Sequence, residues 1–129
     1  MKTVNFFGRD AEFHHVGIAV KAIDDLVKGA EKTTDQIQNV NVAFVNINNL
    51  KVELVEPLNE ASPVVNILKK QQGAYHLCFK VKNIKKAMDT ARKYGFHCIA
   101  KPMPAWAFGE KKIAWLFSRA YGLVELLEG

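Results

Sequence analysis

The chain contains an internal repeat, and this feature limits its fold more than any other. The stretch HVGIAVKAIDDLVKGA, which starts at His15, aligns without a gap to HLCFKVKNIKKAMDTA, which starts at His76. Self-similarity at a fixed spacing indicates two copies of one structural unit. A chain of 129 residues has room for one domain, or for two half-size modules that share a core. We therefore expect two modules of the same architecture.

Each copy begins with an alternating apolar run, which is typical of a strand, and continues with apolar residues at helical spacing. The expected helix-face residues are Ile23, Leu26, Val27 and Ala30 in the first copy, and Ile84, Ala87, Met88 and Ala91 in the second. Further strand-like segments follow each helix. The turn sequence INNLK predicts a hairpin over residues 40–56, and SPVVNILKKQQG predicts a short helix capped by Ser62. Each half is thus a strand, a helix and two or three antiparallel strands.

These elements predict an α+β fold in one domain, residues 1–129. Module 1 covers about 13–57, a connecting helix about 62–72, and module 2 about 74–128. The phrase VELVE of the first module returns as VELLE in the second, where each phrase forms the module's last strand. The second copy is longer, and its segment KPMPAWAFGEKK predicts a long hairpin loop or flap.

Four polar residues occupy related positions in the two copies. Side chains alternate along a strand, so Val16 and Ile18 are expected under the helix and His15 on the opposite face, beside small residues that leave room. The same alternation selects one histidine and one glutamate in each module: His15, Glu53, His76 and Glu125. If the two sheets curl toward each other, these side chains converge on a concave side. Two imidazoles and two carboxylates suit a divalent ion such as Zn, Ni, Co, Mn or Fe.

Other residues near these strands have less specific interpretations. Glu56 and Glu128, at the strand ends, are expected to meet water. Trp106 and Phe108 are either flap residues that close over a substrate or packing residues for the other module or a second subunit. Lys80 is a candidate for binding an anionic part of a substrate.

Composition excludes several classes of protein. No apolar run reaches the roughly 18 residues of a membrane-spanning helix, and MKTVNFFGRD lacks the features of a signal peptide, so we expect a cytoplasmic protein without membrane association. The net charge of +5 comes from scattered lysines without a nucleic-acid-binding motif, which argues against a nucleic-acid partner. Cys78 and Cys98 are expected to be small buried side chains and not a disulfide.

The segments FHHVGIAV, VAFVNINNLKVELVEPL, YHLCFKVKNIKKAMDTARKYGF and GLVELLEG resemble the vicinal oxygen chelate superfamily, from about Phe13 to Glu128. Its methylmalonyl-CoA epimerase-like branch is most similar. The resemblance implies tandem βαβββ modules that form a curled mixed sheet around a concave metal site, and a homodimer. The ligand positions of the superfamily match the four residues selected by strand alternation.

The resemblance also implies a chemistry. A divalent-metal-dependent isomerase, epimerase or lyase would stabilise an enolate and move a proton alpha to a carbonyl or thioester, with Glu125 or Glu53 as the group that carries the proton. Bacterial epimerases of this type have a second glutamate near Val42 and Ala43, where this chain has apolar residues. A metal-free protein that binds a small molecule is the alternative, and Fe(II) oxygen chemistry a third.

Overall fold

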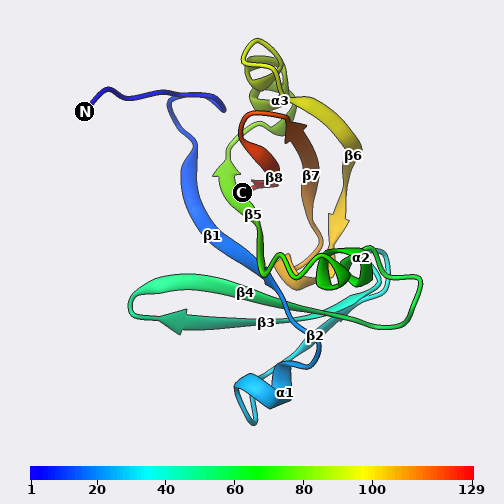
Figure 1. Ribbon diagram of the computed structural model, residues 1–129. Helices are drawn as coiled ribbons and strands as arrows, with labels where there is room; N and C mark the ends of the chain where they lie inside the picture. The colour runs from blue at the N-terminus through cyan, green and yellow to red at the C-terminus, as the bar shows by residue number, and fades with distance from the viewer. The chain divides into compact units, whose positions relative to one another are not determined.

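A computed structural model describes all residues 1–129 of the chain, and each module has the order strand, helix, three strands (Figure 1). The first module consists of β1 (Glu12–Ala19), α1 (Ile23–Leu26), β2 (Thr33–Asp35), β3 (Val40–Ile47) and β4 (Leu50–Pro57). The second consists of β5 (Ala74–Val81), α3 (Ile84–Arg92), β6 (His97–Ala105), β7 (Lys111–Ser118) and β8 (Gly122–Glu128). Helix α2 (Val64–Lys69) connects the modules, and a short 3-10 helix, η1 (Trp106–Phe108), lies between β6 and β7.

The strands follow the order β2-β3-β4-β1-β5-β8-β7-β6 in one sheet. Strands β1 and β4 are parallel, whereas β2 with β3, β3 with β4, and β7 with β8 are antiparallel. The sheet is therefore mixed, and the predicted α+β fold of tandem βαβββ modules is confirmed. The predicted hairpin is also confirmed, because Ile47 pairs with Leu50 across a turn in which Asn48 and Asn49 both have positive φ.

No helix in the structure combines the length and the apolar character needed to span a bilayer.

The chain divides into two compact units whose boundaries differ from those of the modules. The first unit consists of His15–His76 and Ala105–Glu110, and the second of Met1–His14, Leu77–Pro104 and Lys111–Gly129. In the second unit, the apolar side of α3 packs on β7 and β8, where the predicted helix-face residues Ala87 and Ala91 meet Val124 and Leu126. The short segment between β6 and β7 thus belongs to the unit that holds the first module.

Both faces of the sheet in the first unit are covered by other parts of the chain. Ile23 of α1 packs on one face with Val52 and Leu54. The other face, which carries Ala19 and Val55, is covered by side chains of α2 and of the 105–110 segment. The alternation of side chains along the strands assigned residues to the correct face of the sheet. It could not show that α2 and the 105–110 segment form a second layer over the face that carries His15.

The last glutamate of each repeated phrase caps a helix, so the expectation that Glu56 and Glu128 meet water is wrong. The backbone N–H of Ile23 donates to Glu56 Oε1 at 2.7 Å, and that of Ile84 donates to Glu128 Oε2 at 3.0 Å. The first N–H groups of a helix have no partner within the helix, and a carboxylate there also interacts favourably with the helix dipole. The repeated phrase therefore fixes the start of the helix in its own module.

Replacing Glu128 with alanine is expected to lower the free energy of unfolding by about 1 kcal/mol, the usual effect of losing a helix cap. Thermal denaturation should show a melting temperature about 3–5 °C lower than that of the wild type. Glu60→Ala, at an exposed position, is the control and should leave the melting temperature unchanged. Equal melting temperatures for the Glu128 variant and the control would contradict the capping role.

Two local predictions are wrong, and one strand was not located. Helix α1 ends at Leu26, and Leu26 is 62% exposed, because only Ile23 of this helix is buried and Gly29 soon follows with φ +74°. Strand β2 is the third antiparallel strand of the first module, whose position the sequence did not assign because three residues are too few to show a pattern. Much of the predicted loop around Pro102 and Pro104 is strand β6, which tolerates proline because it lies at the sheet edge.

The two cysteines differ in exposure. Cys78 is fully buried, as expected, whereas Cys98 is exposed on β6, and no disulfide joins them. The prediction that both are buried is therefore wrong for Cys98, because β6 has a neighbour on one side only.

Candidate metal centre and active site

Three of the four predicted residues meet in the first unit, each supplied by a different strand. His15 lies on β1, Glu53 on β4 and His76 on β5, and they are 0%, 5% and 4% exposed. The Nε2 atoms of the two histidines lie 3.3 Å apart. Glu53 Oε1 lies 3.4 Å from His15 Nε2 and 3.5 Å from His76 Nε2. Two nitrogens and one oxygen thus face one another in a buried position.

The two histidines control the charge of Glu53. Burial alone would raise the pKa of this carboxyl group, but hydrogen bonds and charge interactions with His15 and His76 outweigh burial and lower the pKa from 4.5 to about 2. Glu53 is therefore a carboxylate at neutral pH, which is the form that accepts hydrogen bonds and binds cations.

Gly17 provides the space for the His76 ring. Gly17 lies opposite Glu53 in the parallel pairing of β1 with β4. A Cβ atom at this position would overlap the imidazole of His76. Glycine two positions after His15 is thus a requirement of the cluster, because any side chain there would push His76 away.

Aromatic rings surround the histidines. Phe108 of η1 stacks on His15, with ring centroids 5.8 Å apart and an interplanar angle of 25°. Phe44 of β3, the cross-strand partner of Glu53, lies 5.4 Å from His15 and 5.6 Å from Phe108. Tyr75 packs edge-on against His76 at 4.5 Å. These apolar contacts limit the positions that the imidazoles can adopt and reduce their access to water.

The chemistry and spacing of these donors fit a divalent metal ion. Histidine nitrogen and carboxylate oxygen are common ligands of zinc and of other first-row transition metals. Donors that share one zinc ion at about 2.0–2.1 Å in tetrahedral geometry lie roughly 3.3 Å apart. The separations of 3.3–3.5 Å within the cluster are close to this value. His15, Glu53 and His76 could therefore hold such an ion with little rearrangement.

The remaining predicted residues lie on other elements. Glu125 is buried on β8 of the second unit, 2% exposed, and pairs across the hairpin with Trp115. Lys80 is half-buried on β5, also in the second unit. Trp106 is 43% exposed on η1, two residues before the ring that stacks on His15.

Two residues of this region were not predicted. Phe44 shares a face of the hairpin with Glu53, and strand alternation counted back from the turn at Asn48 could have placed it there. Asp35 is buried and accepts a hydrogen bond from the N–H of Trp106. No local pattern could have revealed this contact, because it joins positions 71 residues apart.

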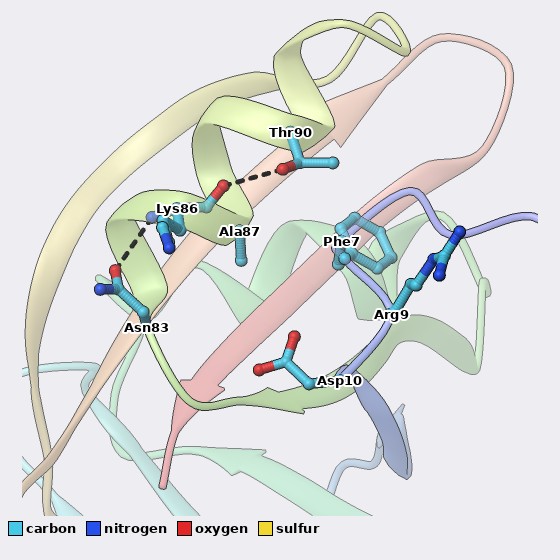
Figure 2. A pocket seen from close by; sticks show the side chains of 8 residues that line it. Phe7, Arg9, Asp10, Asn83, Lys86, Ala87 and Thr90 are labelled. Carbon is cyan, nitrogen blue, oxygen red and sulfur yellow. Dashed lines mark hydrogen bonds between the residues drawn. The ribbon is translucent and has the colours of Figure 1, made fainter.

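A cavity in the second unit is a weaker candidate (Figure 2). It lies between the N-terminal segment and α3, and its lining includes Arg9, Asp10 and Lys86 but none of the predicted site residues. Asn83 accepts from the N–H of Lys86, and Thr90 donates to the Lys86 carbonyl, so these polar side chains serve the helix itself. Binding sites usually combine an apolar wall with polar groups that converge on the ligand. The histidine cluster meets this description better.

Comparison with known proteins agrees with the fold. The sequence model of the Glyoxalase/Bleomycin resistance protein/Dioxygenase superfamily matches residues 14–115. The chain is 30% identical over 126 residues to the ethylmalonyl-CoA/methylmalonyl-CoA epimerase of Cereibacter sphaeroides, an alignment that covers 88% of this chain and 94% of that protein. The chain therefore belongs to this superfamily, as the resemblance of its motifs predicts.

Two solved structures have the same fold. A hypothetical protein from Bacillus halodurans C-125 is 28% identical, with a TM-score of 0.76 and coverage of 94% of this chain and 96% of that one. A methylmalonyl-CoA epimerase variant from Streptomyces coelicolor, in complex with 2-nitronate-propionyl-CoA, is 23% identical, with a TM-score of 0.75 and coverage of 92% and 94%.

Proposed function

We propose that this protein is a divalent-metal-dependent epimerase that moves a proton on the carbon alpha to the carbonyl of an acyl-CoA thioester. The observation that carries the proposal is the buried cluster of His15, Glu53 and His76, whose donor atoms lie 3.3–3.5 Å apart. The epimerase from Cereibacter sphaeroides, similar along most of both chains, supports the reaction type and the substrate class.

We propose Glu125 as the fourth ligand. It corresponds to Glu53 in the internal repeat, as His76 corresponds to His15, and it is buried on the last strand of its module. When bound, a divalent ion supplies a Lewis acid that stabilises negative charge on a substrate oxygen.

The side chains of the protein would carry out the proton transfer. A carboxylate oxygen of Glu125 or Glu53 takes the alpha proton, and the electron pair of the C–H bond moves toward the thioester oxygen. A proton from water then returns to the opposite face of the alpha carbon, which inverts the configuration and neutralises the enolate. We propose that Phe108 and Trp106 line the substrate site and limit its access to water, and that Lys80 binds an anionic group of the substrate. The predicted homodimer concerns contacts beyond a single chain and stays a prediction.

The proposal is tested by incubating the metal-reconstituted protein with methylmalonyl-CoA in deuterated water. We expect uptake of deuterium at the alpha carbon, measured by mass spectrometry, at a rate well above that of buffer alone. Protein treated with a chelator should lose this activity and regain it when metal is restored.

Exchange no faster than in buffer would contradict the epimerase assignment. If the metal-free protein also retained unchanged methylmalonyl-CoA in equilibrium dialysis, the protein would instead be a small-molecule-binding member of the superfamily. Consumption of oxygen together with Fe(II) would indicate oxygenase chemistry.

A further inference from the structure

The segment Ala105–Glu110, inserted in the second module only, packs in the first unit. It forms a closed turn, since the N–H of Gly109 donates to the Trp106 carbonyl and the N–H of Glu110 to the Ala105 carbonyl. Ala105 is 2% exposed, and Ala107 packs against the core next to α2. The insertion is therefore an ordered part of the wall around the histidine cluster and not a free loop.

Asp35 attaches this segment to strand β2. The carboxylate is 2% exposed, and its two oxygens accept different bonds: Oδ1 from the N–H of Gln38 at 3.0 Å, and Oδ2 from the N–H of Trp106 at 3.2 Å. A buried carboxylate must be hydrogen-bonded to offset the loss of hydration. The bond to Trp106 is thus a strong attachment between two segments that are far apart in the sequence.

The attachment lies two residues before the ring that contacts the proposed metal ligands. Trp106 begins η1 and Phe108 ends it, so fixing the first residue also fixes the position from which the Phe108 ring stacks on His15. Phe108 also contacts Phe44, which lies opposite Glu53 on the neighbouring strand.

We infer that Asp35 is a positioning residue that holds the 105–110 segment so that Phe108 covers His15. The inference deepens the proposed function and rests on it, because the site that Phe108 covers is the proposed metal site. Without the attachment, the turn moves away from β2, the Phe108 ring leaves His15, and water reaches the imidazole. Groups that orient a metal ligand commonly change metal affinity by about 10–100-fold when they are removed.

The test uses metal-loaded protein labelled with fluorotryptophan. The chain has two tryptophans, so ¹⁹F NMR gives two resonances, and Trp106→Phe assigns them. The variants are Asp35→Ala, the more conservative Asp35→Asn, Phe108→Ala, and the double variant Asp35→Ala with Phe108→Ala. Thr34→Val is the matched control. It removes a side-chain hydrogen bond from Thr34 of β2 to Asn41 of β3 and leaves the bond from the N–H of Trp106 to Asp35 in place.

In Asp35→Ala, the Trp106 resonance should move toward that of a solvent-exposed tryptophan, and metal release to a chelator should be about 10-fold faster. Asp35→Asn should change the Trp106 resonance and the rate of metal release in the same direction as Asp35→Ala, but by less. Phe108→Ala should also speed metal release, but with little effect on the Trp106 resonance. The double variant should release metal no more than about twofold faster than Phe108→Ala, because the effect of Asp35 passes through Phe108. Thr34→Val should resemble the wild type.

Two results would overturn the inference. Unchanged metal release in both Asp35 variants, or effects of Asp35→Ala and Phe108→Ala that simply add, would show that Asp35 stabilises the fold without acting on the site. A wild-type protein that holds no metal would overturn the proposed function and the role of Asp35 together, so the two failures are distinguishable.

Discussion

Glu125→Gln is expected to reduce turnover of methylmalonyl-CoA by about 10³-fold, within the usual range for loss of a general base. Glutamine has the size of glutamate and keeps an oxygen that can bind a metal ion, but its amide cannot take a proton near neutral pH. Bound metal should therefore largely remain while proton transfer stops. Deuterium exchange at the alpha carbon and metal content are measured on the same samples.

Glu128→Gln is the matched control for this variant. It lies on the same strand, three residues later, and the carbonyl of glutamine can still accept the hydrogen bond from the N–H of Ile84. We expect nearly wild-type exchange. If Glu125→Gln lost metal and turnover together, Glu125 would be a ligand only. If it kept full turnover, Glu53 would be left as the carrier of the proton.

Gly17→Ala is expected to weaken metal binding by on the order of 100-fold. The effect is large because the substitution displaces His76, a proposed metal ligand, and not only a residue that supports a ligand. The new methyl group would overlap the imidazole of His76, and this ring is buried, so it cannot move aside without disturbing its neighbours. Competition with a chromogenic chelator measures the affinity, and circular dichroism checks that the fold is retained.

Gly129→Ala is the control for an added methyl group. A Cβ atom at Gly129 would meet only the lysine side chains of Lys80 and Lys111, at 3.3 Å or more. The control should bind metal as the wild type does. Wild-type affinity in Gly17→Ala would show that His76 has more freedom than the packing implies, and would weaken its assignment as a ligand.

The repeat and the alternation of strand residues were sufficient to predict the main architecture. Two aligned copies with the same strand and helix pattern leave few folds other than tandem modules, and a turn with two asparagines fixes the β3–β4 hairpin. The same alternation placed His15 and Glu53 on one face of the sheet, where the structure brings them to 3.4 Å.

The features that were missed depend on contacts between distant segments. Alternation shows which side chains share a face, but not what covers it, so the burial of the cluster under Phe108 was not foreseen. Glu56 and Glu128 were expected to meet water because they lie at strand ends. Each instead accepts a hydrogen bond from the backbone N–H of a helix that lies earlier in the chain. The bond from Trp106 to Asp35 is of the same kind.

The most direct test of the metal site is the metal content of the purified chain. The wild type and His76→Ala are each reconstituted with divalent ions, desalted and examined by elemental analysis. A metal site formed by the proposed ligands predicts about one ion per wild-type chain. His76→Ala should lose most of the bound metal, because removing one of the few protein ligands strongly weakens the site. A wild-type chain that retains no metal, or a variant that retains as much as the wild type, would contradict the account.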